Sequence, residues 1–223
     1  GIYVLLKQKK PESIIVDHLS MSPLLPLASF CDAYVDGEQF YHEDFTGDYL
    51  GSTALEKIRA ELMGHQFGLI NFFLPELHGE AAAASAPTEN LMAMLLLHDI
   101  NLWFTFCNRD VVRKTWEAVD RFGIAGARFY PYWKDERAAY SAHESVKVSA
   151  YLKSGNEALL VVVNSSDIPV ESGLTLMPEI LELPFSGIAA EDMFSGEPVE
   201  MNNNTIGLHI ESKNFRLIRL FAR

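Results

Sequence analysis

Short apolar segments and amphipathic segments alternate along the first half of the chain. The run "SIIVDHLS" (13–20) predicts a strand buried on both faces, and "PLASFCDA" (26–33) and "FGLINFFLPEL" (67–77) predict two more. Between the last two, "STALEKIRAELMG" (52–64) has apolar residues at helical spacing, and Thr53 precedes it as a capping residue. This alternation predicts βα units with a parallel sheet.

Two more helices are expected before the pattern changes. One begins with Thr88 as its N-cap and continues through a Leu- and Met-rich stretch to about residue 98. The other is "NRDVVRKTWEAVDRFG" (108–123), in which Asn108 has the position of an N-cap and Gly123 that of a C-terminal cap.

From about Ala127 the helical pattern gives way to short strand-like runs separated by Gly, Asn, Ser and Pro, which is typical of an antiparallel sandwich. We therefore expect two domains, a partial (β/α) barrel over residues 1–127 and an antiparallel β-sandwich over 128–223.

About three βα units precede the boundary, fewer than a parallel sheet with two buried faces normally has. The front part is then either a truncated barrel or a small sheet that a partner chain completes. The strand-like runs are 146–153, 157–166, 171–178, 205–212 and 215–223.

Composition and charge exclude several classes of protein. The 223 residues are 48% hydrophobic and 22% charged, as in an ordinary soluble globular protein. A net charge of −12 argues against binding to a nucleic-acid backbone, and the longest apolar run, 91–97, is too short to span a bilayer. Cys31 and Cys107 are expected to be free thiols. No Gly-rich phosphate loop or tight metal-ligand spacing occurs, so no cofactor and no metal are expected.

Polar residues gather where the predicted strands end. In a barrel of parallel strands, function is found at these carboxyl ends. A carboxylate next to aromatic side chains is what a sugar site uses, because the acid acts at the glycosidic bond and a ring packs on the apolar face of the sugar. The candidate residues are His18, Asp32, Tyr34, Asp36, Glu38, Asn71 and Glu76.

Each of these signals has a plainer alternative. Asp36-Gly37 is a common turn dipeptide, and His18 could be a core histidine bonded to a backbone carbonyl. The aromatic run "RFYPYW" (128–133) could be a sugar platform, although such a run more often fills the seam between two domains.

The order of these segments resembles the last part of a glycoside-hydrolase-type (β/α)₈ barrel with a β-sandwich tail. It is most similar to a glycosidase-like family related to the β-N-acetylgalactosaminidases. The resemblance covers nearly the whole chain, and "SFCDAYVDGEQF" (29–40) is its sharpest element.

The resemblance implies a function and a set of roles. Glu38 would be the acid or an acceptor for a sugar hydroxyl, Asp32 the second catalytic candidate, and His18 and Asp36 would orient substrate hydroxyls. In such barrels the acid/base pair usually comes from earlier strands, so the chain is expected to lack part of the catalytic machinery. The expected partner is a carbohydrate. The alternative is a non-catalytic sugar-binding or structural fragment, which could associate with itself through an exposed sheet edge.

Overall fold

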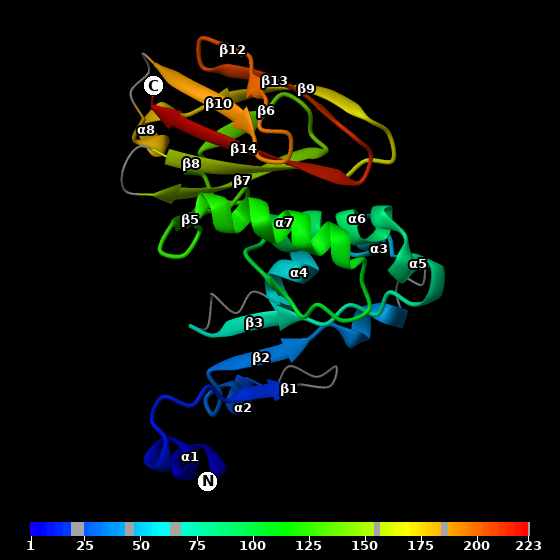
Figure 1. Cartoon of the computed structure of the whole chain (residues 1–223), viewed down its shortest axis with the longest axis vertical. Helices are drawn as coiled ribbons and strands as arrows, with labels where there is room; N and C mark the ends of the chain where they lie inside the picture. The colour runs from blue at the N-terminus through cyan, green and yellow to red at the C-terminus, as the bar shows by residue number, and fades with distance from the viewer. Residues whose placement is uncertain (19–24, 43–46, 63–67, 154–156, 184–186, 223) are drawn as a thin grey trace.

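The computed structural model describes residues 1–18, 25–42, 47–62, 68–153, 157–183 and 187–222 (Figure 1). A small parallel sheet lies toward the N-terminal end of an elongated molecule, and two antiparallel sheets lie at the other end (Figure 1). Helices α6 and α7 lie between them.

The parallel sheet has the strand order β1-β2-β3-β4 in the described part of the chain. Its strands are β1 (Val16–His18), β2 (Ala33–Asp36), β3 (Ile70–Phe73) and β4 (Asn101–Leu102). All neighbouring pairs are parallel, so the predicted βα architecture is confirmed. The short fourth strand was not predicted from the sequence.

Helix α1 precedes β1, and the other helices of this part follow the strands. The helices are α1 (Ile2–Lys9), α2 (Leu25–Ala28), the 3₁₀ helix η1 (Glu38–His42), α3 (Tyr49–Ser52), α4 (Leu55–Glu61), α5 (Gly79–Ala83), α6 (Ser85–Leu97) and α7 (Arg109–Phe122). Helix α7 has the predicted ends, because the Asn108 side chain accepts from two backbone N–H groups and Gly123 adopts the left-handed conformation at φ 76°.

Three local predictions were wrong. Residues 25–28 form helix α2, so β2 begins only at Ala33. Thr53 closes α3 and does not cap α4, since the shorter α4 begins after Ala54. Thr88 lies inside α6, where its hydroxyl accepts a hydrogen bond from the Asn108 backbone N–H at 2.8 Å.

Burial on both faces is confirmed for β2, whose four residues are all buried, but not for β1 and β3, which are exposed on one face. Side chains alternate along a strand, so His18 and Val35 lie on one face and Tyr34 and Asn71 on the other. We call these the His18 face and the Tyr34 face. The helices pack on the Tyr34 face, whereas on the His18 face Val16 is 44% exposed and Ile70 is 48% exposed.

Helix α6 is buried around nearly its whole circumference. It contacts α3, α7 and β4 on one side and β7, β8 and β14 on the other. Leu95 of α6 therefore belongs to one core cluster that also includes Phe73 of the parallel sheet and Leu217 of β14. A helix with both sides covered needs no polar stripe, which explains the continuous Leu and Met sequence.

The carboxyl-terminal part consists of two antiparallel sheets, with the orders β11-β10-β14-β8-β7-β5 and β12-β13-β9-β6. The five predicted strand runs all form strands. The elements are β5 (Arg128–Tyr130), β6 (Ala139–Ser141), β7 (Val146–Lys153), β8 (Glu157–Asn164), β9 (Val170–Leu176), α8 (Pro178–Leu181), β10 (Ile188–Asp192), β11 (Pro198–Val199), β12 (Met201–Asn202), β13 (Thr205–Ile210) and β14 (Asn214–Ala222).

Strand β8 lies between two layers, the helices on one face and the second sheet on the other. Leu159 and Val161 face the helices and belong to the core cluster of α6, while Leu160 and Val162 face the second sheet. The strand is buried on both faces and therefore reads as an unbroken apolar run.

Aromatic residues of "RFYPYW" fill the seam between the two parts. Tyr132 is buried, and its ring lies edge-on to His98 at the end of α6. The domain boundary at 127/128 stays a prediction. Both cysteines are free thiols, and within the described ranges no helix is long and apolar enough to cross a membrane.

Candidate functional site

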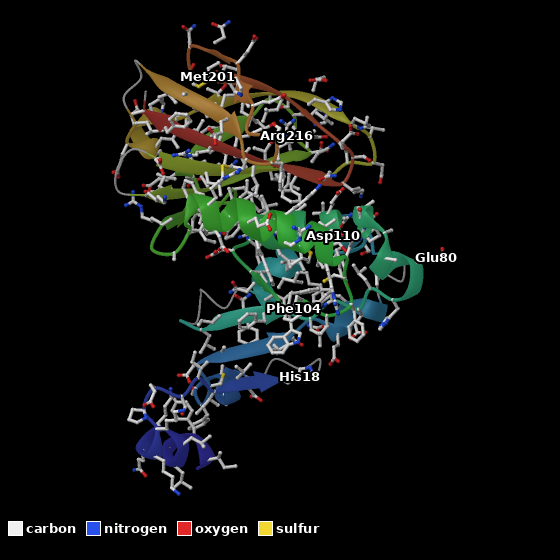
Figure 2. All side chains as sticks on the ribbon, in the orientation of Figure 1. His18, Glu80, Phe104, Asp110, Met201 and Arg216 are labelled. Carbon is white, nitrogen blue, oxygen red and sulfur yellow. The ribbon has the colours of Figure 1, made fainter. Side chains whose placement is uncertain are left out.

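Parallel strands place their carboxyl ends at one edge of the sheet, and two predicted site residues meet there. The Nε2 atom of His18, at the end of β1, lies 3.1 Å from the Oε2 atom of Glu38, which follows β2. The two side chains are 49% and 32% exposed, so both remain accessible to a ligand. Figure 2 labels His18 at the tip of β1.

Gly37 fixes where Glu38 lies. Its φ of 139° is one that L side chains rarely adopt, and a Cβ atom there would come within 2.6 Å of the Leu74 carbonyl oxygen. The chain therefore turns tightly against the end of β3 before η1 begins with Glu38. The glycine of the Asp36-Gly37 dipeptide is required by this close approach.

Asp36 is buried at the end of β2. Its Oδ2 atom accepts a hydrogen bond from Gln39 at 3.0 Å, and the Gln39 side chain in turn accepts from the Gly37 N–H at 3.1 Å. Its Oδ1 atom is buried without a hydrogen-bond partner. The turn interpretation thus describes Asp36 better than a role in directly binding a substrate hydroxyl.

A second carboxylate–histidine pair follows β3. Glu76 and His78 are 2.5 Å apart through Oε2 and Nε2, and the backbone N–H of Glu76 donates to the Tyr49 hydroxyl at 3.2 Å. The His78 ring lies 4.7 Å from the ring of Phe106. Glu76 is therefore at the predicted edge, with a partner that the sequence reasoning did not identify.

Aromatic side chains come next to β4 at the same edge. The Trp103 backbone N–H donates to the Phe73 carbonyl at 2.8 Å, which continues the pairing of β3 with β4. The Trp103 indole packs edge-on against Phe72 at 5.7 Å and is 41% exposed. By alternation, Phe72 lies on the His18 face.

Sequence reasoning missed Trp103 because β4 is only two residues long. The available signal was the aromatic run "NLWFTFC" (101–107), directly after a helix and before the next one. Phe104 of this run is labelled in Figure 2 and is also exposed.

Asp32 lies at the opposite edge of the sheet. It precedes the first residue of β2, forms an ion pair with Lys7 at 2.8 Å and accepts from the Ile15 N–H at 2.8 Å. The hydrogen bond from Lys7 lowers the pKa of Asp32. The structure does not bring Asp32 together with Glu38, because the two lie at opposite ends of one strand; Asp32 instead anchors α1.

Tyr34 and Asn71 lie on the Tyr34 face, away from His18. Both side chains donate to the Leu62 carbonyl oxygen, the Tyr34 hydroxyl at 3.0 Å. That carbonyl belongs to the end of α4, where backbone acceptors lack partners within the helix. Burial raises the pKa of Tyr34 far above its usual range, consistent with a permanently protonated donor. Tyr34 and Asn71 therefore supply hydrogen-bond donors to the carboxyl-terminal end of helix α4.

No cluster of three or more His, Cys, Asp or Glu side chains that could hold a metal ion occurs among the described residues. The described edge thus offers carboxylates, imidazoles and aromatic rings.

The chain is similar to one known family and to several solved structures. Residues 111–186 match the family model of the glycoside hydrolase 123, C-terminal domain. The match begins in α7 and extends through the first antiparallel strands, about a third of the chain. No curated protein sequence matches the chain.

Solved structures extend the likeness over the whole chain. The noncanonic maltogenic alpha-amylase AmyB from Thermotoga neapolitana has a TM-score of 0.60 at 12% identity, covering 99% of this chain and 58% of the amylase. An alpha-amylase from Geobacillus thermoleovorans has a TM-score of 0.60 at 10% identity, with 99% and 56% covered. An Anoxybacillus alpha-amylase has a TM-score of 0.58 at 9% identity, with 99% and 55% covered.

These likenesses concern the fold. The chain has the architecture of the carboxyl-terminal part of a glycoside-hydrolase-type barrel enzyme with a β-domain behind it, as the sequence resemblance implied. It spans a little over half the length of the amylases.

Proposed function

We propose that the chain is the carboxyl-terminal part of a glycoside hydrolase and that the ends of β1–β4 form a sugar-binding edge. Glu38, held by His18, is the acid or the acceptor for a sugar hydroxyl. Glu76 with His78 binds further hydroxyls, and Trp103 provides the apolar surface for a sugar ring. The observation that carries this proposal is the 3.1 Å contact between His18 and Glu38 at the carboxyl edge of a glycosidase-like sheet.

The chemistry of the edge supports a carbohydrate ligand. Carboxylates accept hydrogen bonds from hydroxyl groups, an imidazole can donate or accept, and an exposed indole covers the apolar face of a pyranose. All three kinds of group follow adjacent strands, whose ends are about 4.8 Å apart from strand to strand. The span from β1 to β4 is therefore about 14 Å, enough for a disaccharide.

Hydrolysis requires two carboxyl groups that flank the scissile bond, about 5–10 Å apart. Asp32 does not fit as the partner of Glu38, because Asp36 is already four positions further along β2, about 13 Å at roughly 3.3 Å per residue, and Glu38 lies beyond Asp36. We infer that Glu38 serves within a larger site to which Asp32 does not contribute.

The displacement of Asp32 also favours a second candidate function. With one carboxylate of the predicted pair at the far edge of the sheet, the chain could be a non-catalytic carbohydrate-binding protein. In that case Glu38 binds a hydroxyl and transfers no proton.

The test combines turnover and binding. The chain is assayed with 4-nitrophenyl glycosides of glucose, galactose and N-acetylgalactosamine, and binding of the corresponding methyl glycosides is measured by NMR. Turnover that is lost in Glu38→Gln supports the acid role. Binding without turnover, weakened about tenfold in Glu38→Gln, supports the binding role. The absence of both binding and turnover contradicts the proposal.

Asp32→Asn is the matched control. It removes a carboxylate from the same strand, at the edge that carries no proposed function. We expect it to leave sugar binding unchanged. A loss of binding as large as that of Glu38→Gln would show that the carboxyl edge is not the site.

A further inference from the structure

A cavity separate from the strand ends opens between α6, α7 and the β10–β14 pair. Its volume is about 580 Å³, within the range of about 300–1,000 Å³ typical of small-molecule sites. The residues on which its chemistry depends are Glu89, Lys114, Arg121, Phe194, Asn214 and Phe215. We call this cavity the α7 groove.

Phe194 is the aromatic surface of the α7 groove. It is 43% exposed and packs edge-on against the buried Phe215, with ring centroids 5.6 Å apart and an interplanar angle of 73°. One ring thus supports another, and the outer ring stays accessible.

A buried carboxylate holds the turn that carries Phe194. The Oδ1 atom of Asp192 accepts from the backbone N–H groups of Phe194 and Ser195, both at 2.9 Å. Its Oδ2 atom accepts from Nε of Arg216 at 2.7 Å. Burial raises the pKa of Asp192, but the donors from Ser195 and Arg216 outweigh burial and lower the pKa overall. The aromatic side chain is therefore positioned before any ligand binds, which reduces the entropy lost on binding.

The rim of the α7 groove is polar and carries both signs of charge. Asn214 donates to Oε2 of Glu89 at 2.9 Å, which orients that carboxylate. The guanidinium of Arg121 donates to the Met193 carbonyl. Lys114 lies on the same stripe of α7 and is exposed. The rim also carries the carboxylates of Asp110 and Glu117, both of which form ion pairs with Arg113. Carboxylate acceptors beside ammonium and guanidinium donors suit a neutral ligand rich in hydroxyl groups better than an anion.

We propose that the α7 groove is a second carbohydrate-binding site, separate from the strand-end site. A sugar ring packs on Phe194, and its hydroxyls bond to Glu89 and Lys114. The choice of a carbohydrate as ligand rests on the proposed function. Two sugar sites on one chain would retain a polymeric substrate more strongly than either site alone.

The test is an NMR titration of the ¹⁵N-labelled chain with maltotriose, galactobiose and N-acetylgalactosamine. We expect saturable shifts of the amide signals of Lys114, Phe194 and Ser195 with at least one sugar. Phe194→Ala should raise the Kd at the groove about tenfold, and the exposed Lys114→Ala, which cannot disturb the core, about threefold. Trp103→Ala at the strand-end site is the control and should leave groove binding unchanged.

The outcomes separate the two proposals. Binding at the strand ends without shifts at Lys114 and Phe194 overturns the second site and leaves the proposed function intact. Binding at the groove alone supports the second site and contradicts the strand-end site. Groove binding that Lys114→Ala and Phe194→Ala do not change would also overturn the assignment.

Discussion

The imidazole of His18 and the carboxylate of Glu38 lie 3.1 Å apart, although His18 ends β1 and Glu38 begins the 3₁₀ helix that follows β2. Exposed polar side-chain pairs of this kind contribute little to folding, about 0–1 kcal/mol. Their position at the carboxyl edge of a glycosidase-like fold therefore suggests a role in binding more than in stability.

Replacing His18 should separate binding from stability. We expect His18→Ala to weaken sugar binding about three- to tenfold, because Glu38 loses the partner that orients it. The free energy of unfolding should change by less than about 1 kcal/mol, since the pair is exposed. Calorimetric titration and urea unfolding of the same variant measure the two quantities. A large loss of stability with unchanged binding would contradict this role.

Gly37 should tolerate no side chain. Gly37→Ala would place a Cβ atom within 2.6 Å of the Leu74 carbonyl oxygen at a φ of 139°, so the turn must shift. We expect a loss of about 2 kcal/mol or more in the free energy of unfolding, together with weaker sugar binding as Glu38 moves. Gly207→Ala is the control, because nothing lies within 4 Å of its Cβ position. Equal unfolding curves for the two variants would count against the close approach.

Trp103 should contribute to sugar binding and Trp116 should not. Both indoles are about equally exposed, 41% and 40%, but Trp116 is on α7 and packs against Phe104. Removal of a stacking ring costs about 0.5–1.5 kcal/mol beyond the lost area, so Trp103→Ala should weaken binding about tenfold. Fluorescence titration of the two alanine variants makes the comparison. Equal losses in both would mean that ring stacking at the strand ends is not specific.

The buried His98 should make folding sensitive to acid. Burial lowers its pKa to about 4, and its ring lies against the Met94 carbonyl and the Tyr132 hydroxyl. The unfolded chain binds this proton near pH 6.5, so the folded state loses stability as the pH falls from about 6.5 to about 4. The expected slope is about 1.4 kcal/mol per pH unit in this window.

Urea unfolding at several pH values tests the effect of His98. His98→Gln removes the titrating group, so its unfolding free energy should depend less on pH between pH 6.5 and pH 4. An unchanged slope in the variant would show that other groups cause the acid sensitivity.

Much of the fold follows from local sequence patterns. The caps Asn108 and Gly123 predict both ends of α7, and the apolar run at 157–166 predicts the strand β8. Thr88 misleads because a polar residue inside a helix can have a distant partner, here the backbone of Asn108.

The candidate site was less predictable, because it too depends on contacts between residues that are distant in the sequence. Two residues of one short segment lie at opposite edges of a sheet when a strand runs between them, which is why Asp32 and Glu38 are separated while His18 and Glu38 meet. No periodicity reveals a two-residue strand such as β4, so the place of Trp103 depended on tertiary pairing with Phe73.

The most direct test of the account is a side-chain NMR titration that follows the imidazole signals of His18 and the indole signal of Trp103 as methyl glycosides are added. The account predicts that both signals shift with the same Kd for at least one sugar, and that Glu38→Gln raises this Kd about tenfold while Asp32→Asn leaves it unchanged. Signals that stay fixed while the sugars bind elsewhere, or equal effects of the two substitutions, would contradict it.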